Sequence, residues 1–394
     1  MTFPERFSNL PEYAFPRLRK LLAASEPGGE VINMTIGEPR HAMPDFVGDV
    51  IAANIDEFAK YPPNDGTPEL RAAIAEWIGR RFDVTVDPET QVMTLNGTRE
   101  GLFNAAIALC PEQKNGERPA ILIPNPFYQV YAVAAVTAFA DPVFVPATAE
   151  TGFLPDYASL PRDVLDRTAI AFLCSPSNPQ GAVADRAYWE QLIALAETHD
   201  FQIFADECYS EIYRTTLPPG GLEMARAVGA DPERVVIFHS LSKRSNLPGL
   251  RSGFVASGPE SMKRLRQLRA YSGAPLPLPL QRVAERAWAD EDHVAASLKI
   301  YQQKFRLADE ILAGVPGYQG PEGGFFLWLP VTDGEQAART LYEKTGVRVL
   351  PGAYLSRDVN GENPGKGYIR VAMVSDMDEL QRGLRQLRAC LYEQ

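Results

Sequence analysis

Short apolar segments rich in β-branched residues alternate, between residues 119 and 257, with segments whose apolar positions recur at helical spacing. This alternation is typical of βα units arranged around a mostly parallel sheet. The strands of such a sheet are buried on both faces, so they read as continuous apolar runs. The expected strands are 119–123, 143–145, 168–174, 201–205, 234–239 and 253–257, with helices that include 98–110 and 185–199.

The pattern changes after about residue 259, where longer helical segments predominate. The proline-rich stretch 272–279 interrupts two of them, because proline cannot continue a helix. We therefore expect an α/β protein with a second, smaller α+β unit, divided into an arm with part of the small domain (1–45), a large domain (46–284) and a small domain (285–394). The elements expected in this second part are helices 259–271, 279–315, 334–345 and 376–392 and strands 324–331, 347–351 and 368–374.

Charge and composition disfavour several classes of partner and site. The 394 residues carry a formal net charge of −11, which disfavours nucleic acid and anionic membranes as partners. The N-terminus lacks a basic stretch followed by an apolar run, and the longest near-apolar segment, 132–140, is about half a membrane span, so we expect a cytoplasmic protein. The four cysteines form no C-x-x-C pair and the histidines show no metal-ligand spacing, so we expect reduced thiols and no metal site.

A lysine follows one of the expected strands directly. Lys243 lies in Ser-Leu-Ser-Lys-Arg-Ser-Asn-Leu-Pro-Gly-Leu-Arg, after strand 234–239, and ligands of open α/β sheets bind at the carboxyl ends of the strands. With Arg251 eight residues later, a cationic pocket would lower the amine pKa and suit it for imine chemistry. Taken alone, a loop lysine is more often solvated.

An acidic residue ends the neighbouring strand. Asp206 lies in Ala-Asp-Glu-Cys-Tyr, and a buried carboxylate at this position needs a partner. A protonated pyridine nitrogen would be one, which makes the ring an electron sink, and Tyr209 could donate to a phenolate oxygen of the same ring. The alternative for Asp206 is an ordinary helix N-cap.

Three further strand ends carry polar or aromatic residues. Asn178 is held between two prolines and could present its amide to the same phenolate, although Asn-Pro is also a common turn. Gly97 and Thr98 open a helix, where backbone N–H groups could bind a phosphate together with Ser240 and Arg251. Tyr128 could stack on a flat ring, or else be a core aromatic.

Four of these segments, N-G-T, S-P-S-N-P-x-G, D-E-x-Y and S-x-S-K-x-x-x-x-P-G-x-R-x-G, resemble in this order the fold-type I pyridoxal-phosphate (PLP) aminotransferases of class I/II. The resemblance covers essentially the whole chain. It implies pyridoxal 5′-phosphate as cofactor and a large domain with a mostly parallel seven-stranded sheet beside a smaller α+β domain.

Carried over by motif, the resemblance implies catalytic roles for Lys243, Asp206 and Tyr209. Lys243 would bind the cofactor as an imine and later shuttle the α-proton. Asp206 would pair with the pyridine nitrogen. The cofactor-binding set that the resemblance implies is Gly97, Thr98, Arg99 through its backbone N–H, Tyr128, Asn178, Asp206, Tyr209, Ser240, Lys243, Arg251 and Tyr61 of the partner subunit.

The resemblance also implies how substrate is held. Arg370, in Gly-Tyr-Ile-Arg-Val, matches the arginine that clamps the substrate α-carboxylate, with Gly37 and Asn178 beside it. The segment 60–71 matches one that reaches the cofactor phosphate of a second subunit through Tyr61. It therefore implies a homodimer with shared active sites, acting on small amino and keto acids.

Within the superfamily the chain is most similar to proteobacterial N-succinyl-L,L-diaminopimelate aminotransferases, on segments such as 37–41, 125–131 and 363–370. This likeness implies transamination between glutamate and N-succinyl-2-amino-6-oxopimelate in lysine and cell-wall precursor biosynthesis, with Arg40 or His41 as candidates to read the distal carboxylate. An aminotransferase for aspartate, alanine or aromatic amino acids, a PLP-dependent β-lyase, and a non-catalytic binding protein on the same fold stay open as alternatives.

Overall fold

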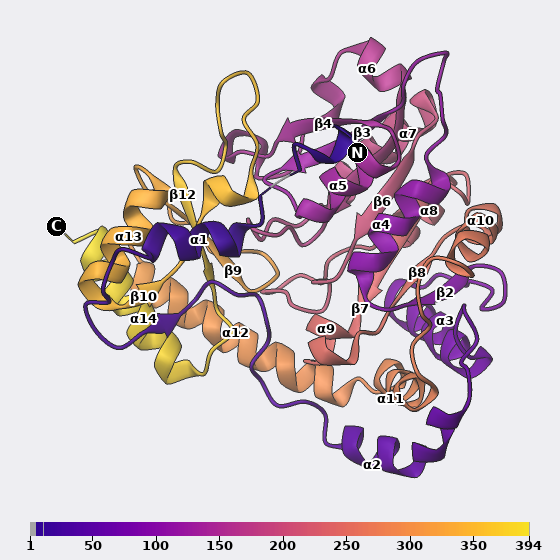
Figure 1. Ribbon diagram of the computed structural model, residues 1–394, viewed down its shortest axis with the longest axis horizontal. Coiled ribbons are helices and arrows are strands. Elements are labelled where there is room, and N and C mark those ends of the chain that lie inside the picture. Colours follow the sequence, from indigo (N-terminus) through magenta and orange to yellow (C-terminus); the bar gives the residue numbers. More distant parts are fainter. Residues whose placement is uncertain (1–4, 11, 394) are drawn as a thin grey trace.

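The computed structural model describes residues 5–10 and 12–393. At its centre is one large sheet, whose strands are β2 (Val92–Leu95), β3 (Ala120–Asn125), β4 (Asp141–Pro146), β5 (Thr168–Cys174), β6 (Gln202–Asp206), β7 (Val235–Ser240) and β8 (Gly253–Ala256). They lie in the order β2-β8-β7-β6-β5-β3-β4. Strand β8 is antiparallel to both neighbours and the other pairs are parallel. This confirms the expected mostly parallel, seven-stranded sheet (Figure 1).

Helices cover both faces of this sheet. Every residue of the central strand β5 is buried, as expected for a strand between two helical layers. The helices of the chain are α1 (Ala14–Leu22), α2 (Phe46–Ala53), α3 (Pro68–Phe82), α4 (Thr98–Leu109), α5 (Gln129–Thr137), α6 (Arg162–Asp166), α7 (Arg186–His199), α8 (Gly221–Val228), α9 (Leu241–Arg244), α10 (Pro259–Arg269), α11 (Leu278–Ala289), α12 (Asp292–Leu312), α13 (Gly334–Thr345) and α14 (Met377–Leu391).

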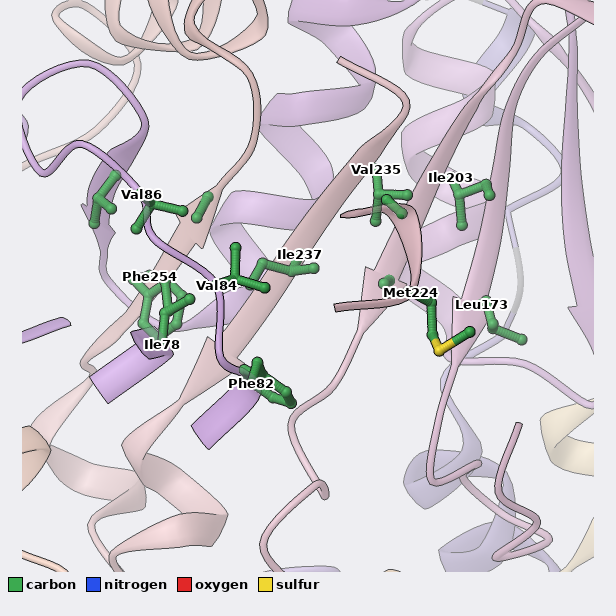
Figure 2. Packing of buried hydrophobic residues seen from close by; sticks show 14 of the residues in the cluster. Ile78, Phe82, Val84, Val86, Leu173, Ile203, Met224, Val235, Ile237 and Phe254 are labelled. Atoms are coloured by element: carbon green, nitrogen blue, oxygen red, sulfur yellow. The ribbon is translucent and has the colours of Figure 1, made fainter. Parts of the chain in front are cut away.

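Alternate residues of each strand enter two different cores. One core joins the sheet to α4, α5 and α10. The other joins it to α3, α7, α8 and α11, and Figure 2 shows part of this second core, where side chains of the strands meet those of α3 and α8. The residues labelled there are Ile78, Phe82, Val84, Val86, Leu173, Ile203, Met224, Val235, Ile237 and Phe254.

The smaller unit has its own core and its own sheet. Strands β9 (Phe326–Pro330), β11 (Leu350–Pro351) and β12 (Tyr368–Ala372) form an antiparallel sheet in the order β11-β12-β9. Strand β1 (Ile32–Asn33) pairs in parallel with β10 (Val347–Arg348). Helices α12, α13 and α14 contribute to this core. The expected α+β unit is therefore present.

The N-terminal segment connects the two units. Helix α1 packs against α13 of the smaller unit, whereas the short 3-10 helix Glu5–Phe7 contacts α5 of the large one. In Figure 1 the dark α1 lies across the yellow and orange smaller unit, and the chain then runs to α2 beside α11. Residues 12–15 consequently pass between the two units.

The elements of the structure differ in places from those expected. The helix expected over 279–315 is two helices, α11 and α12, because Asp290 adopts an extended conformation and its carboxylate accepts a hydrogen bond from the Asp292 amide at 3.1 Å. Strand β2 was not among the expected strands, since four residues without alternation give little signal.

The break at Asp290 bears on the domain boundary. Helix α11 runs through the expected boundary at 284/285 and packs on α3 and α2, and its Ala287 and Trp288 belong to the core of the large unit. We therefore propose that the large domain extends to residue 290. In the part of the chain that the structure describes, no helix is both long enough and apolar enough to span a lipid bilayer.

Candidate active site

A cavity of about 320 Å³ opens at the carboxyl ends of the central parallel strands. Three of them end beside it, β5 at Cys174, β6 at Asp206 and β7 at Ser240. The sheet order explains why, since β5, β6 and β7 are neighbours and their parallel direction brings their ends to one edge. Predicted site residues that line the cavity are Gly37, Thr98, Arg99, Tyr128, Asn178, Asp206, Tyr209, Ser240, Lys243, Arg251 and Arg370.

Lys243 lies on the one-turn helix α9 that follows β7. Ser240 caps this helix by accepting a hydrogen bond from the Ser242 amide at 3.1 Å. The Lys243 Nζ donates to the Gly37 carbonyl oxygen, which comes from the N-terminal segment. Burial lowers the pKa of the Lys243 amine to about 8. A substantial neutral fraction is therefore present near pH 8, which is the form that can attack a carbonyl carbon.

Asp206 is the one acidic residue among the described residues that line the cavity. Its Oδ2 accepts a hydrogen bond from the Tyr131 hydroxyl at 2.7 Å, and its Oδ1 accepts a long one from the Cys208 amide at 3.4 Å. Burial raises the pKa of the Asp206 carboxyl. A carboxylate in this setting gains most from a cationic or N–H partner inside the cavity.

The residues expected to bind the phosphate lie close together. Gly97 adopts φ of 83° before α4, and a Cβ there would collide with the Arg251 guanidinium, so glycine is required for this close approach. Arg251 donates to backbone carbonyls of Pro248 at 2.9 Å and Asn96 at 3.3 Å. The Ser240 hydroxyl and the first N–H groups of α4, beginning at Thr98, face the same cavity.

The smaller unit contributes Arg370, on strand β12, to the cavity lining. Arg370 is buried, its Nη1 donates to the Asn178 Oδ1 at 3.0 Å, and its Nη2 donates to the Thr35 carbonyl at 2.8 Å. The guanidinium also lies 4.1 Å from the ring centroid of Phe326, and its buried Nε has no partner. Because arginine can only donate, the bond orients the Asn178 amide so that its NH₂ group points away from Arg370.

Tyr128 and Tyr209 are aromatic residues of the cavity wall. The Tyr128 hydroxyl accepts a hydrogen bond from the Arg99 Nε at 2.9 Å, so Arg99 offers its side chain and not only the backbone N–H expected from the sequence. Tyr209 is buried against Phe325 and Phe326. Burial raises the pKa of both phenols, which keeps them protonated as hydrogen-bond donors.

Four candidates are absent from the cavity lining. Gly97 lies against the Arg251 guanidinium beside the cavity. Tyr61 is fully exposed, as a residue must be if it serves a second subunit, and its role remains a prediction. Arg40 forms an exposed ion pair with Glu379 at 3.4 Å, and the His41 Nε2 accepts from the buried Lys304 Nζ at 2.8 Å. Because both side chains are directed to other partners, neither lies where it was expected to read the distal end of the substrate.

Other cavity residues were missed by the sequence analysis. Tyr131 follows Tyr128 by three residues, which is one helical turn, and this spacing could have indicated a shared face. Cys174 and Cys208 also line the cavity, where the Cys208 thiol lies 3.1 Å from the Thr98 hydroxyl. Among the described residues, no three or more potential metal ligands lie close enough together to bind a metal ion. The functional groups that line the cavity include an amine, a carboxylate and guanidinium groups.

These side chains fit PLP by their chemistry. Lys243 could hold its aldehyde carbon and Asp206 its ring nitrogen, while the corner formed by Gly97, Thr98, Ser240 and Arg251 could hold its phosphate. The strongest support for this fit is the buried carboxylate of Asp206, which accepts one short hydrogen bond from the described residues, at 2.7 Å, and one long one, at 3.4 Å.

Comparisons with known proteins find aminotransferases that match over almost the whole chain. An LL-diaminopimelate aminotransferase of Dehalococcoides mccartyi is 31% identical over 396 residues, 98% of each chain. A solved aminotransferase of Neisseria meningitidis matches with a TM-score of 0.93 and 38% identity over 98% of this chain and 99% of its own. A probable N-succinyldiaminopimelate aminotransferase of Thermus thermophilus matches with a TM-score of 0.84 and 26% identity over 96% and 100%.

The family model described as "Aminotransferase class I and II" matches residues 29–387. That range contains the strands of both units and every predicted site residue. The chain therefore belongs to the class I and II aminotransferases.

Proposed function

We propose that this aminotransferase moves an amino group between glutamate and N-succinyl-2-amino-6-oxopimelate, and so takes part in lysine and cell-wall precursor biosynthesis. Enzymes of its family use PLP and act on amino and keto acids. When bound, PLP stores the amino group between two half-reactions and its ring withdraws electrons from the substrate α-carbon.

The observation that carries the proposed chemistry is the meeting of Lys243, Asp206 and Arg370 in one cavity. Arg370 would bind the α-carboxylate and orient the substrate. Lys243, with its pKa near 8, could take the proton from the α-carbon and return it. Asp206 would hold a proton on the ring nitrogen of the cofactor, while Asn178 and Tyr209 would donate to the ring oxygen.

The substrate is supported by likeness of sequence and by the relatives' names. The Thermus thermophilus relative is named for N-succinyldiaminopimelate, and this chain resembles such enzymes along several segments. A second candidate is LL-diaminopimelate itself, because the Dehalococcoides mccartyi relative is named for it and matches over 98% of both chains. The two substrates differ in charge at the distal end, where only LL-diaminopimelate carries a free ammonium.

Single half-reactions test the proposal. The PLP-loaded protein is mixed separately with glutamate, N-succinyl-L,L-diaminopimelate, LL-diaminopimelate, aspartate and alanine, and the change of cofactor absorbance is followed. We expect fast conversion by glutamate and the succinylated compound. Conversion by LL-diaminopimelate, but not by its succinyl derivative, would replace the proposed substrate by the second candidate.

The remaining outcomes test the alternative functions, namely another aminotransferase, a β-lyase and a non-catalytic protein. Fast conversion by aspartate or alanine alone would support transamination but replace the proposed substrate by that amino acid. Release of pyruvate and ammonia from a β-substituted alanine would indicate a β-lyase. No conversion of any amino acid would favour a non-catalytic protein.

A further inference from the structure

Four cationic side chains line the active-site cavity among the described residues, namely Lys243, Arg251, Arg370 and Arg99. The first three have proposed roles toward the cofactor aldehyde, the phosphate and the α-carboxylate. Arg99 is left without a role, although it was expected to contribute only its backbone. The proposed substrates carry a second carboxylate at their far end, for which neither Arg40 nor His41 is available.

Arg99 is held in place by uncharged partners. It is the second residue of α4, exposed at the cavity, and its Nε donates to the Tyr128 hydroxyl at 2.9 Å. The Tyr13 phenol, which also lines the cavity, interacts with the same guanidinium. Within the described part of the protein Arg99 forms no ion pair, and a guanidinium with five N–H donors that is held by two phenols keeps donors for an anion.

Three acidic residues at or beside the cavity are engaged elsewhere. The Oε1 of Glu100, the residue after Arg99, lies 2.6 Å from the Arg269 Nε. Glu12 lies 3.8 Å from Arg17, and its backbone oxygen accepts a hydrogen bond from Gln129 at the cavity wall. Asp206, which lines the cavity, is buried and bonded to Tyr131. Among the described residues, none of these carboxylates forms an ion pair with Arg99.

Arg99 and Arg370 approach the cavity from different units. Arg370 comes from β12 of the smaller sheet, and Arg99 comes from α4 beside the large sheet. A guanidinium fork suits a planar carboxylate, to which it can donate two parallel hydrogen bonds. We propose that Arg99 binds the distal carboxylate of the substrate, and that the site thereby selects amino and keto acids with a carboxylate at each end.

This inference rests on the proposed function, since it requires turnover of an acid with a distal carboxylate. Tyr128 then has two tasks, because the ring that would cover the cofactor also orients the residue that reads the substrate. Tyr128 would then stack on the cofactor and, together with Arg99, determine which substrate binds.

The test compares two amino acids of equal chain length in single half-reactions, glutamate and 2-aminopentanoate, which lacks the distal carboxylate. In Arg99→Gln we expect the efficiency with glutamate to fall about 10- to 100-fold, the usual effect of losing a charged hydrogen-bond donor, and that with 2-aminopentanoate to stay within about twofold. Arg99→Lys should recover part of the loss. The matched control is Arg40→Ala, which removes a nearby arginine paired with Glu379 and should alter neither rate.

A binding measurement separates recognition from turnover. Calorimetry of the PLP-loaded protein with glutarate and with pentanoate should show preference for glutarate in the wild type and its loss in Arg99→Gln. An equal loss for both acids, or a fall in PLP affinity that accounts for the change, would assign Arg99 a structural role and overturn the inference. So would an unchanged preference.

The two proposals can fail separately. If the wild type converts glutamate but not the succinylated compound, and Arg99→Gln still loses the preference for glutamate, the proposed substrate is wrong and the role of Arg99 stands. If both natural substrates react and Arg99→Gln treats glutamate like the wild type does, the role of Arg99 is wrong and the proposed function stands.

Discussion

The pair of Tyr131 and Asp206 shows how one hydrogen bond can set the charge of a buried acid. Burial raises the pKa of Asp206, which favours its neutral form, and a neutral acid would not keep a ring nitrogen protonated. The phenol of Tyr131 opposes this effect, because it donates to the ionised form at 2.7 Å. Its ring is fixed by stacking on Phe172, with 4.4 Å between the centroids.

We therefore predict that Tyr131→Phe weakens PLP binding about tenfold, corresponding to loss of one hydrogen bond to a charged group of ~1.5 kcal/mol. Titration of the apoprotein with PLP measures this. Tyr188→Phe is the matched control, because the Tyr188 hydroxyl donates to the Pro155 carbonyl at 2.7 Å outside the cavity, and it should leave PLP affinity unchanged. Unchanged affinity in Tyr131→Phe would contradict the role given to this bond.

Lys243 gives a prediction on pH. Its pKa is about 8 in the folded protein against 10.5 as the ordinary value, so below pH 8 the folded state bears the full cost of a buried charge, and that cost vanishes above pH 10.5. Lys243→Met should abolish transamination yet raise the free energy of unfolding of the apoprotein by about 1–3 kcal/mol at pH 7. Urea unfolding at pH 7 and pH 10.5 measures the difference, and a gain that does not shrink at the higher pH would refute the cause.

At the residue scale, the sequence predicted the side chains that stand directly at strand ends, such as Asp206 and Ser240. It missed Tyr131, which reaches the cavity from inside a helix, where a buried tyrosine is usually a core residue. It placed Arg40 and His41 at the cavity, whereas both lie outside the cavity lining, because proximity along the chain to Gly37 does not determine which way a loop side chain turns. The roles of the gathered residues remain predictions.

At the scale of elements, α12 anchors two segments of the smaller unit through a single buried side chain. The Lys304 Nζ donates to the carbonyl of Met373 at 3.0 Å and to that of Ser375, and it bonds the His41 Nε2. Burial and the neighbouring Lys304 lower the pKa of His41 to about 4, so this histidine is neutral at pH 7 and can accept the bond. The segment that carries Gly37 is thus tied to the end of β12, which carries Arg370.

Replacing Lys304 should loosen this junction. Lys304→Met leaves two buried carbonyl groups without a donor, and we expect a loss of about 2–4 kcal/mol in the free energy of unfolding. Chemical denaturation measures it. Lys299→Met, an exposed lysine on the same helix, is the control and should change stability by less than about 0.5 kcal/mol. Equal effects of the two substitutions would show that the buried amine is not what holds the junction.

The hydropathy pattern predicted the buried strands of the large sheet well, because a strand covered on both faces is apolar throughout. It did not separate α11 from α12, since the apolar period continues through the break and only the local bond from Asp292 to the Asp290 carboxylate ends the first helix. It merged β10 and β11 into one strand, although they belong to two different sheets. Pairing partners are a property of the assembled chain and are not visible in one segment.

At the scale of the whole molecule, the resemblance implies that two subunits share their sites. Tyr61 is fully exposed in the isolated chain, and other large apolar side chains near it in sequence, Ile55 and Phe58, are about half exposed. Patches of this kind mark association sites more often than free surface. The homodimer with Tyr61 reaching the partner's phosphate remains a proposal.

Mixing two variants tests this proposal. Tyr61→Ala and Lys243→Ala are each impaired alone, but a mixed dimer has one site that combines an intact Lys243 with an intact Tyr61 of the partner subunit. After unfolding and refolding an equimolar mixture, we expect activity well above the sum of the parents, near a quarter of the wild type when pairing is random. Activity equal to that sum would show that each site is built from one chain.

The order of the strands and the position of the domain boundary were beyond prediction from composition or periodicity. Six of the seven strands of the large sheet were expected individually, and the family resemblance implied a mostly parallel sheet of seven strands. The order β2-β8-β7-β6-β5-β3-β4 was not predicted. The boundary depends on which core receives Trp288, and that is decided by packing between segments distant along the chain.

If Arg370 binds the substrate as proposed, its hydrogen bond to Asn178 is exchanged for one to the substrate. An incoming α-carboxylate would displace the Asn178 oxygen from a guanidinium that is already solvated by the protein. The measured affinity is then the difference between two bonds and understates the strength of the new one. The released amide can turn toward whatever lies beside it in the cavity, so occupancy at the carboxylate clamp would be transmitted to the ring oxygen of the cofactor. In such a site, a weak ground-state affinity is compatible with a strong and well-directed contact.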